Sequence, residues 1–280
     1  MSGFRYVVAD VFTDTALEGN QVAVFTDARE IPDDRLQRIA REMNLSETVF
    51  VYTPDGDGHA RIRIFTPTRE MEFAGHPTLG TAFVLSAPLS LEQINLETLR
   101  GIVPVRLERE DGRIVFGRMD QPLPTVEPYG NDAELFDILG VDGSELPVEV
   151  YDNGVLHVYV CLGSEDEVAA LKPDLRRLGE QPTFCFNCFA GEGKTWKTRM
   201  FAPSSGVAED PATGSAAGPL ALHLARHGRI AFGDEIEISQ GVEVGRPSKL
   251  FARVDGSADD VQRVEVGGSA VIVARGELKA

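Results

Sequence analysis

The sequence has 280 residues, of which 42% are hydrophobic and 25% charged, a composition typical of a globular protein and a length that suggests two domains. Lys and Arg number 27 against 44 Asp and Glu, and the net charge of −17 argues against binding to nucleic acid or to an anionic membrane surface. No run approaches the ~18 apolar residues of a membrane span, no leader-like segment opens the chain, and three cysteines is an odd number, so we expect a reduced, cytoplasmic protein.

Seven runs rich in β-branched and aromatic residues predict strands in the first part of the chain. They span residues 4–11, 21–26, 48–52, 60–65, 93–98, 102–109 and 113–119. A helix is predicted from Asp33 or Asp34, either of which can cap its start, to about Asn44, because apolar residues recur there at helical spacing. A shorter helix is expected at about 81–85.

A proline-rich stretch follows the last of these strands. Its prolines, at positions 122, 124 and 128, favour extended and semi-rigid backbone. We therefore place a domain junction here, with one half at 1–119 and the other at 120–263.

The second half repeats two motifs of the first half in the same order. Arg63-Ile64-Phe65-Thr66-Pro67 recurs as Arg199-Met200-Phe201-Ala202-Pro203, and His76-Pro77-Thr78-Leu79-Gly80-Thr81-Ala82 recurs as Asp210-Pro211-Ala212-Thr213-Gly214-Ser215-Ala216. The offsets between the copies, 136 (199 − 63) and 134 (210 − 76), are nearly equal. Two ordered matches of this kind predict two homologous halves.

Each copy of the second motif leads into an apolar helix. Thr81 and Ser215 are suitable N-cap residues, and Pro219 favours a start near Ser215, since proline is tolerated in the first turn. That helix should end near Arg226 or His227, before Gly228. Facing helix starts would form an anion site without Lys or Arg, although two ordinary capped core helices would give the same pattern.

One titratable residue precedes each predicted helix, His76 in the first half and Asp210 in the second. Such a pair suits a site in which one group donates a proton and another accepts it. As isolated residues, either would more often be a cap or a solvated polar group. The repeat is what makes them catalytic candidates.

Several segments together resemble the phenazine-biosynthesis isomerase family. They are Asp10-Val11-Phe12, Leu17-Glu18-Gly19-Asn20, Val22-Ala23-Val24-Phe25, Arg41-Glu42-Met43-Asn44-Leu45-Ser46-Glu47, Phe73-Ala74-Gly75-His76-Pro77, Glu209-Asp210-Pro211-Ala212-Thr213-Gly214-Ser215-Ala216-Ala217-Gly218-Pro219, Asn187-Cys188-Phe189-Ala190-Gly191 and Gln240-Gly241-Val242-Glu243-Val244-Gly245-Arg246-Pro247. The resemblance covers nearly the whole chain.

That family is similar in fold to diaminopimelate epimerase. The resemblance implies an α/β (α+β) protein of two pseudo-symmetric epimerase-like domains, each a curled, mostly antiparallel sheet around a central helix. The active site would lie in the cleft between them. In that fold the last strand, 264–275, can return to the first half.

The resemblance also implies an activity and its residues. The family converts trans-2,3-dihydro-3-hydroxyanthranilate to its ketone isomer without metal or organic cofactor. Glu47 would be the acid/base, assisted by the catalytic residues His76 and Asp210. The substrate would be bound by Ser215, Gly75 and Gly214, with Ser46 and Asn20 lining the pocket. Without the resemblance, Glu47 would pass for an exposed strand-end carboxylate.

Two other patterns suggest metal or redox chemistry less strongly. Cys185 and Cys188 have Cys-x-x-Cys spacing but lie in a strand-like run without a second pair, which favours buried packing. His223 and His227 are spaced i, i+4 and could bind a metal together, but a position near a helix C-terminus favours a structural role. No phosphate loop or dinucleotide fingerprint is present, and we expect no cofactor.

Three functions remain open from the sequence. The first is the isomerase acting on a small anionic cyclic substrate. The second is an isomerase or epimerase of the same fold acting on another amino or hydroxy acid, and the third is a non-catalytic small-molecule-binding protein. The resemblance further implies a homodimer.

Overall fold

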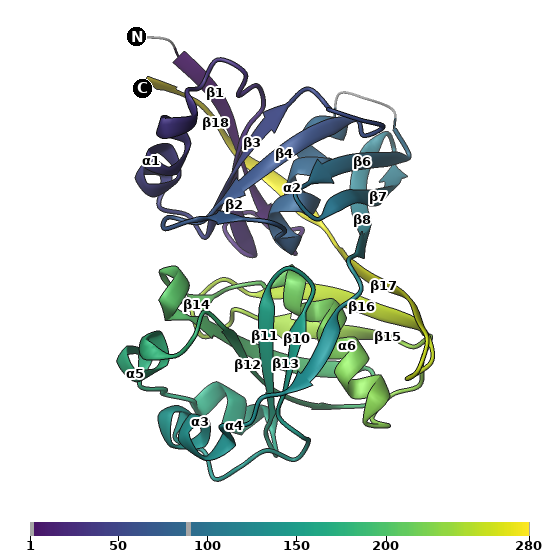
Figure 1. Cartoon of the computed structure of the whole chain (residues 1–280). Coiled ribbons are helices and arrows are strands. Elements are labelled where there is room, and N and C mark those ends of the chain that lie inside the picture. Colours follow the sequence, from purple (N-terminus) through teal and green to yellow (C-terminus); the bar gives the residue numbers. More distant parts are fainter. Residues whose placement is uncertain (1–2, 88–90, 280) are drawn as a thin grey trace.

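The computed structural model describes residues 3–87 and 91–279. Figure 1 shows two lobes, one above the other, each with a sheet around one central helix. The chain passes to the lower lobe after β8 (Arg113–Gln121) and back to the upper lobe between β17 (Val261–Gly268) and β18 (Ala270–Lys279). Among the described residues, no helix has the length and apolar character needed to span a membrane.

The remaining elements follow the chain through both lobes. The first lobe contains β1 (Gly3–Val11), β2 (Asn20–Phe25), α1 (Asp33–Met43), β3 (Glu47–Tyr52), β4 (Ala60–Phe65), β5 (Glu70–Met71), α2 (Gly75–Ser86), β6 (Gln93–Thr98) and β7 (Gly101–Glu110). The second contains β9 (Thr125–Pro128), α3 (Asp132–Leu139), β10 (Glu149–Asp152), β11 (Leu156–Cys161), α4 (Glu165–Ala170), α5 (Leu175–Glu180), β12 (Cys185–Glu192), β13 (Thr195–Ala202), the 3₁₀ turn Pro203–Ser205, β14 (Val207–Asp210), α6 (Gly214–Arg226), β15 (Glu235–Gln240) and β16 (Ser248–Gly256).

The two lobes have the same strand order. In the first, β1 pairs with β2, β2 is parallel to β3, β3 pairs with β4, β4 is parallel to β6, and β7 and β8 complete the sheet. In the second, β10, β11, β12, β13, β15, β16 and β17 repeat that series, with the parallel pairs in the same places. The sheets are therefore mostly antiparallel, and the predicted fold class is confirmed.

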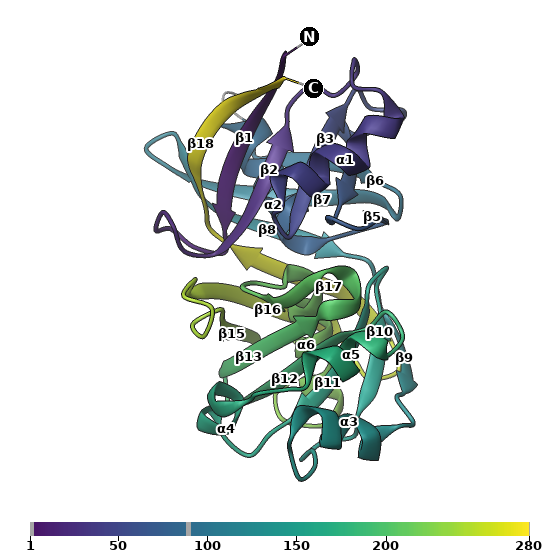
Figure 2. The ribbon, with the colours of Figure 1, turned by 90° about the vertical axis from the view of Figure 1, so that its left-hand side faces the viewer.

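Two strand pairings tie the lobes together. β8 pairs antiparallel with β17, which joins the two sheets directly. β18 pairs antiparallel with β1 along its whole length, and Figure 2 shows the two side by side at the edge of the first lobe. The predicted last strand, 264–275, thus corresponds to the end of β17, a break at Ser269 and the first part of β18.

The predicted strands of the first part of the chain are all present, within one or two residues at most ends. Three details of the helices differ from the prediction. α1 follows Pro32, so Asp33 and Asp34 lie in its first turn and do not cap it. α2 begins at Gly75 after Ala74, not at Thr81, and α6 begins at Gly214 after Thr213, so neither Thr81 nor Ser215 is an N-cap.

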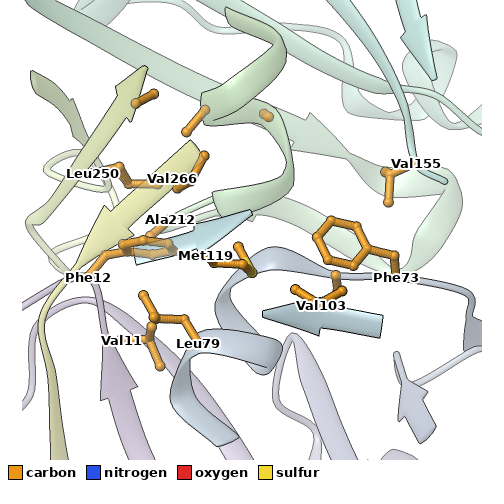
Figure 3. Packing of buried hydrophobic residues seen from close by; sticks show 14 of the residues in the cluster. Val11, Phe12, Phe73, Leu79, Val103, Met119, Val155, Ala212, Leu250 and Val266 are labelled. Carbon is orange, nitrogen blue, oxygen red and sulfur yellow. The ribbon is translucent and has the colours of Figure 1, made fainter. Parts of the chain in front are cut away.

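The central helices are buried on all sides, which explains the early start of α2. Every residue of α2 except Leu85 is buried, and its mostly apolar sequence suits a core position. Pro77 lies in the first turn, where its missing N–H costs little. Figure 3 shows part of the core cluster around these helices, in which Phe12 and Leu79 of the first lobe and Val266 of the second belong to one continuous group.

Candidate active site

The N-termini of the two central helices meet face to face between the lobes. A Cβ on Gly75 would lie 2.4 Å from the backbone nitrogen of Ser215, and a Cβ on Gly214 would lie 3.0 Å from that of His76. The first distance is shorter than any real Cβ contact, so the approach requires glycine at position 75, and the second leaves little room for a side chain at position 214. The free N–H groups of both helices therefore point toward one small region, which is a suitable place for an anion.

Glu47 and His76 are in contact at the edge of this region. Glu47 is the first residue of β3, beside β2, and His76 is the second residue of α2. Glu47 Oε2 lies 3.2 Å from His76 Nε2, and neither atom makes a well-aligned hydrogen bond to any other described residue. The side chains are 14% and 4% exposed, so a proton bound to this pair is largely shielded from water.

Asp210, at the end of β14, is held by three side chains. Asn20 Nδ2 donates to its Oδ1 at 2.8 Å, Ser46 Oγ donates to the same oxygen at 3.0 Å, and Thr213 Oγ1 donates to Oδ2 at 2.7 Å. Asn20 Nδ2 also lies 3.2 Å from His76 Nδ1. The amide of Asn20 thus connects Asp210 of the second lobe with His76 of the first.

Burial dominates the electrostatics of the three titratable groups. It raises the pKa of Glu47 well above the usual value, and the neighbouring charge of Asp210 raises it further. Burial also raises the pKa of Asp210, although the hydrogen bonds from Thr213, Ser46 and Asn20 oppose the shift. Burial lowers the pKa of His76 to about 3, so its imidazole is neutral near pH 7.

Ser215, the second residue of α6, is also fixed by neighbours of its own lobe. Its Oγ lies 3.1 Å from Nε2 of His157, a fully buried residue of β11, and its backbone carbonyl accepts a hydrogen bond from Asn153 at 2.8 Å. The Asn187 amide lies 3.4 Å from the other ring nitrogen of His157. These contacts hold the start of α6 in place within the second lobe.

A cavity of about 40 Å³ lies where these groups converge. The predicted residues on its wall are Glu47, Gly75, His76, Asp210, Gly214 and Ser215. Arg69, Cys185 and Thr213 also line it. Larger hollows of about 530, 570 and 600 Å³ lie elsewhere, but none brings together groups with strongly shifted pKa values, so we assign the site to the small cavity.

Asn20 and Ser46 were expected to line the pocket, but neither lies on the cavity wall. Both lie behind Asp210, because their side chains are occupied by hydrogen bonds to its carboxylate. His76 and Asp210 also occupy different places relative to their helices. His76 lies inside the first turn of α2, whereas Asp210 lies four residues before α6.

Sequence reasoning missed three residues of the site. Thr213 was within the repeated motif but was not singled out, and it both binds Asp210 and immediately precedes α6. His157 lies within a strand whose pattern carries no functional signal. Arg69, exposed beside the cavity, follows the repeated strand motif of the first half.

The cysteine spacing has a structural explanation. Cys185 and Cys188 point to opposite sides of β12, since Cys185 belongs to the large core cluster and Cys188 to a separate one under α3 to α5. All three cysteines are buried and free. The pair therefore cannot bind one metal ion or form a disulfide across the strand.

Comparisons with known proteins agree on one family. The family model described as "Phenazine biosynthesis-like protein" matches residues 9–276. The trans-2,3-dihydro-3-hydroxyanthranilate isomerase of Pseudomonas aeruginosa is 54% identical over 272 residues, which cover 97% of this chain and 98% of that protein.

Solved structures agree with the sequence comparison. The crystal structure of a Bacillus anthracis phenazine biosynthesis protein of the PhzF family matches with a TM-score of 0.88 and 25% identity, covering 100% of both chains. A hydroxyproline epimerase from Agrobacterium vitis matches with a TM-score of 0.69 at 14% identity, covering 99% of this chain and 91% of that one. The second similarity concerns the fold alone.

Proposed function

The chain belongs to the phenazine biosynthesis-like protein family, and from this premise we propose that it is an isomerase that converts trans-2,3-dihydro-3-hydroxyanthranilate to its ketone isomer. Glu47 carries the reacting proton in this proposal. The observation that supports it most directly is the buried contact of Glu47 with His76, beside Asp210, on the wall of one cavity.

The proton is moved between carbons of the substrate ring. The ionised carboxylate of Glu47 removes the hydrogen from the ring carbon that bears the hydroxyl group, and the electron pair of that C–H bond shifts into the ring. Glu47 then returns the proton to another ring carbon, and the resulting enol becomes the ketone. A carboxylate with a raised pKa is a stronger base than an exposed one, and general base catalysis of this kind contributes about 10²–10⁴-fold.

His76 and Asp210 serve the polar groups of the ring. A neutral His76 can donate or accept a hydrogen bond. It adds no positive charge, which would lower the pKa of Glu47 and make its carboxylate a weaker base. Asp210, fixed by Thr213, can accept a hydrogen bond from the substrate's amino group. Asn20 and Ser46 act as positioning residues, because they hold the carboxylate of Asp210.

The substrate carboxylate binds at the two helix starts. The N–H groups near Gly75 and Gly214, with the hydroxyl of Ser215, provide donors and the positive ends of two helix dipoles. Such a site is compatible with a protein whose net charge is −17. The cavity of about 40 Å³ is far smaller than the ~300–1,000 Å³ of ordinary ligand pockets, so the lobes must move apart to admit a ring.

The test is to incubate the purified protein with trans-2,3-dihydro-3-hydroxyanthranilate in deuterium oxide. Turnover to the ketone supports the proposal. Solvent deuterium should appear at the newly protonated ring carbon to the extent that the proton held by Glu47 exchanges with solvent before it is returned. Binding without conversion would favour a silent binding protein. Neither binding nor conversion, with turnover of another amino or hydroxy acid, would favour a different isomerase or epimerase of this fold.

Assembly and compartment are proposed on separate grounds. We propose a homodimer in the cytoplasm, which rests on the family resemblance and on the odd number of reduced cysteines. The negative net charge supports the absence of a nucleic-acid partner. Light scattering of the purified chain measures the mass of the particle in solution.

A further inference from the structure

A second cluster of titratable side chains lies at the opposite end of α6 from the active site. Glu149, the first residue of β10, extends its carboxylate toward the last turns of that helix. Glu149 Oε2 lies 3.2 Å from His223 Nδ1 and 3.0 Å from His227 Nε2. The three ligand-type atoms all lie within 4.8 Å of one another.

We propose that Glu149, His223 and His227 form a binding site for a divalent transition metal such as Zn²⁺, separate from the catalytic cavity. The sequence showed only the histidine pair, spaced i, i+4. The fold adds the third donor from a strand about 75 residues away, since His223 and Glu149 are 74 positions apart.

The spacing of the donor atoms suits a tetrahedral ion. Zinc is bound by His nitrogen and carboxylate oxygen at about 2.0–2.2 Å, which places neighbouring ligand atoms of a tetrahedron roughly 3.3–3.5 Å apart. The separations of 3.2 and 3.0 Å from Glu149 Oε2 need to widen only slightly to reach that value. The combination of two imidazoles and one carboxylate is a usual one for zinc and leaves a fourth position for water.

The protonation states favour binding. Burial lowers the pKa of His223, so its ring is neutral and one of its two nitrogens is free of a proton. Hydrogen bonds from the histidines, Tyr151 and Arg226 keep the pKa of Glu149 at about 2 against the opposing effect of burial, so the carboxylate is ionised. A metal replaces these hydrogen bonds: His223 must carry its ring proton on Nε2, and His227 on Nδ1, for the nitrogens that face Glu149 to become ligands.

Two groups compete with a metal for the same oxygen. Arg226 Nη1 donates to Glu149 Oε2 at 3.1 Å, and the hydroxyl of Tyr151 donates to it at 2.9 Å. The Arg226 side chain is 28% exposed and can turn toward solvent, whereas Tyr151 is fully buried and can remain as a second contact to the carboxylate. The guanidinium therefore weakens metal binding, and its removal should strengthen it.

The position of the cluster separates it from catalysis. His223 follows Ser215 by eight residues on α6, which corresponds to about 12 Å along a helix axis. His227 is 20% exposed, so an ion can enter from solvent without passing through the catalytic cavity. A bound ion would join the C-terminal end of α6 to β10 and so stabilise the second lobe.

The experiment is a calorimetric titration of the full chain with Zn²⁺ after treatment with a chelator. We expect one ion per chain, at least 100-fold weaker binding in Glu149→Gln and in His227→Gln, and at least fivefold tighter binding in Arg226→Met. His59→Gln is the matched control, because His59 is an exposed histidine of the first lobe. It should bind as the wild type does, and Zn²⁺ should raise the melting temperature of wild type and His59→Gln but not of His227→Gln.

Several results would overturn the proposal. One is the absence of a stoichiometric ion in the wild type at micromolar zinc. The cluster would then serve only to satisfy the carboxylate of Glu149 with hydrogen bonds from Arg226 and the two histidines. Another is unchanged binding in His227→Gln, because the proposed site would then have lost a ligand without effect. Unchanged binding in Arg226→Met would exclude Oε2 of Glu149 as a ligand.

Discussion

Gly75 and Ser215 lie in direct backbone contact across the two lobes. A Cβ added to Gly75 would come within 2.4 Å of the Ser215 nitrogen and within 2.5 Å of the carbonyl carbon of Gly214. The neighbouring atoms are backbone, so they cannot turn aside as a flexible side chain would. The distance between the two helix starts is therefore set by the absence of a side chain at position 75.

Gly75→Ala is expected to push the helix starts apart. Overpacking of this kind costs about 1–3 kcal/mol of unfolding free energy, and we expect turnover to fall by ~10²-fold, because small displacements of positioned groups have such effects. Gly143→Ala is the control, since Gly143 has no atom near its virtual Cβ and no left-handed φ. Equal turnover of the two variants would show that the approach of the helices is unimportant for catalysis.

Glu47→Gln tests the proposed base. The amide has the shape of the protonated carboxyl group, which the buried site favours, so the variant should fold with unchanged or slightly higher stability. Turnover should fall by about 10²–10⁴-fold, since the amide cannot accept a proton from carbon. Steady-state kinetics with the ring substrate measures the loss.

The control for this variant is Glu42→Gln on the exposed face of α1. It should behave as the wild type in both stability and turnover. Retention of full activity in Glu47→Gln would remove Glu47 from the mechanism, while the fold and the family assignment would stand.

The repeat in the sequence predicted the pseudo-symmetry of the fold, but not the alignment of the two helices. The motif offset of 134 pairs His76 with Asp210, whereas the helices begin at Gly75 and Gly214, an offset of 139 (214 − 75). Gly75, Pro77 and Gly80 lower the local helix propensity, which delayed the predicted start to residue 81. Burial on all sides outweighs that propensity, and a single sequence does not show it.

The contacts within the site were less predictable than its members. Glu47, His76 and Asp210 came from the family resemblance together with the repeat, and the structure places all three on one cavity. His157 could not be found in this way, because the contact with Ser215 depends on how β11 packs against α6. Likewise, the position of Asn20 behind Asp210 depends on the packing of one lobe against the other.

The stability of the protein should depend on pH through Glu47. Its pKa in the folded state lies above the usual value of 4.5, so the folded state binds more protons than the unfolded state from about pH 4.5 up to the raised pKa. The unfolding free energy therefore falls as pH rises through that window, by at most about 1.4 kcal/mol per pH unit. Glu47→Gln lacks this contribution.

Urea unfolding of both proteins between pH 5 and about 8 measures the effect, since linkage acts where the two states differ in bound protons. The stability of Glu47→Gln relative to the wild type should increase as pH rises. Glu42→Gln should follow the wild type at every pH. A constant difference between Glu47→Gln and the wild type would mean that the carboxyl group titrates alike in both states.

An ion pair between the lobes is expected to fix the segment that leads to Asn20, and through it the position of Asp210. Arg246 Nη2 donates to Asp10 Oδ1 at 2.8 Å, and the guanidinium also donates to the carbonyl oxygens of Glu18 and Gly19. Asp10 is fully buried. Because Gly19 precedes Asn20, the arginine fixes the segment that holds Asp210.

Arg246→Met should destabilise the protein by about 3–5 kcal/mol, since it leaves the buried carboxylate of Asp10 without a counter-charge and with only the hydrogen bond from the Leu17 N–H. The double variant with Asp10→Asn removes the unpaired charge and should recover part of that stability, but not the turnover, because the carbonyls of Glu18 and Gly19 still lack their donor. Arg253→Met breaks a partly exposed ion pair to Asp255, which keeps Arg263 as a second partner, and should change stability by no more than ~1 kcal/mol. If the double variant regained full turnover, the anchoring of Asn20 by Arg246 would be refuted and only the charge balance at Asp10 would remain to explain the loss.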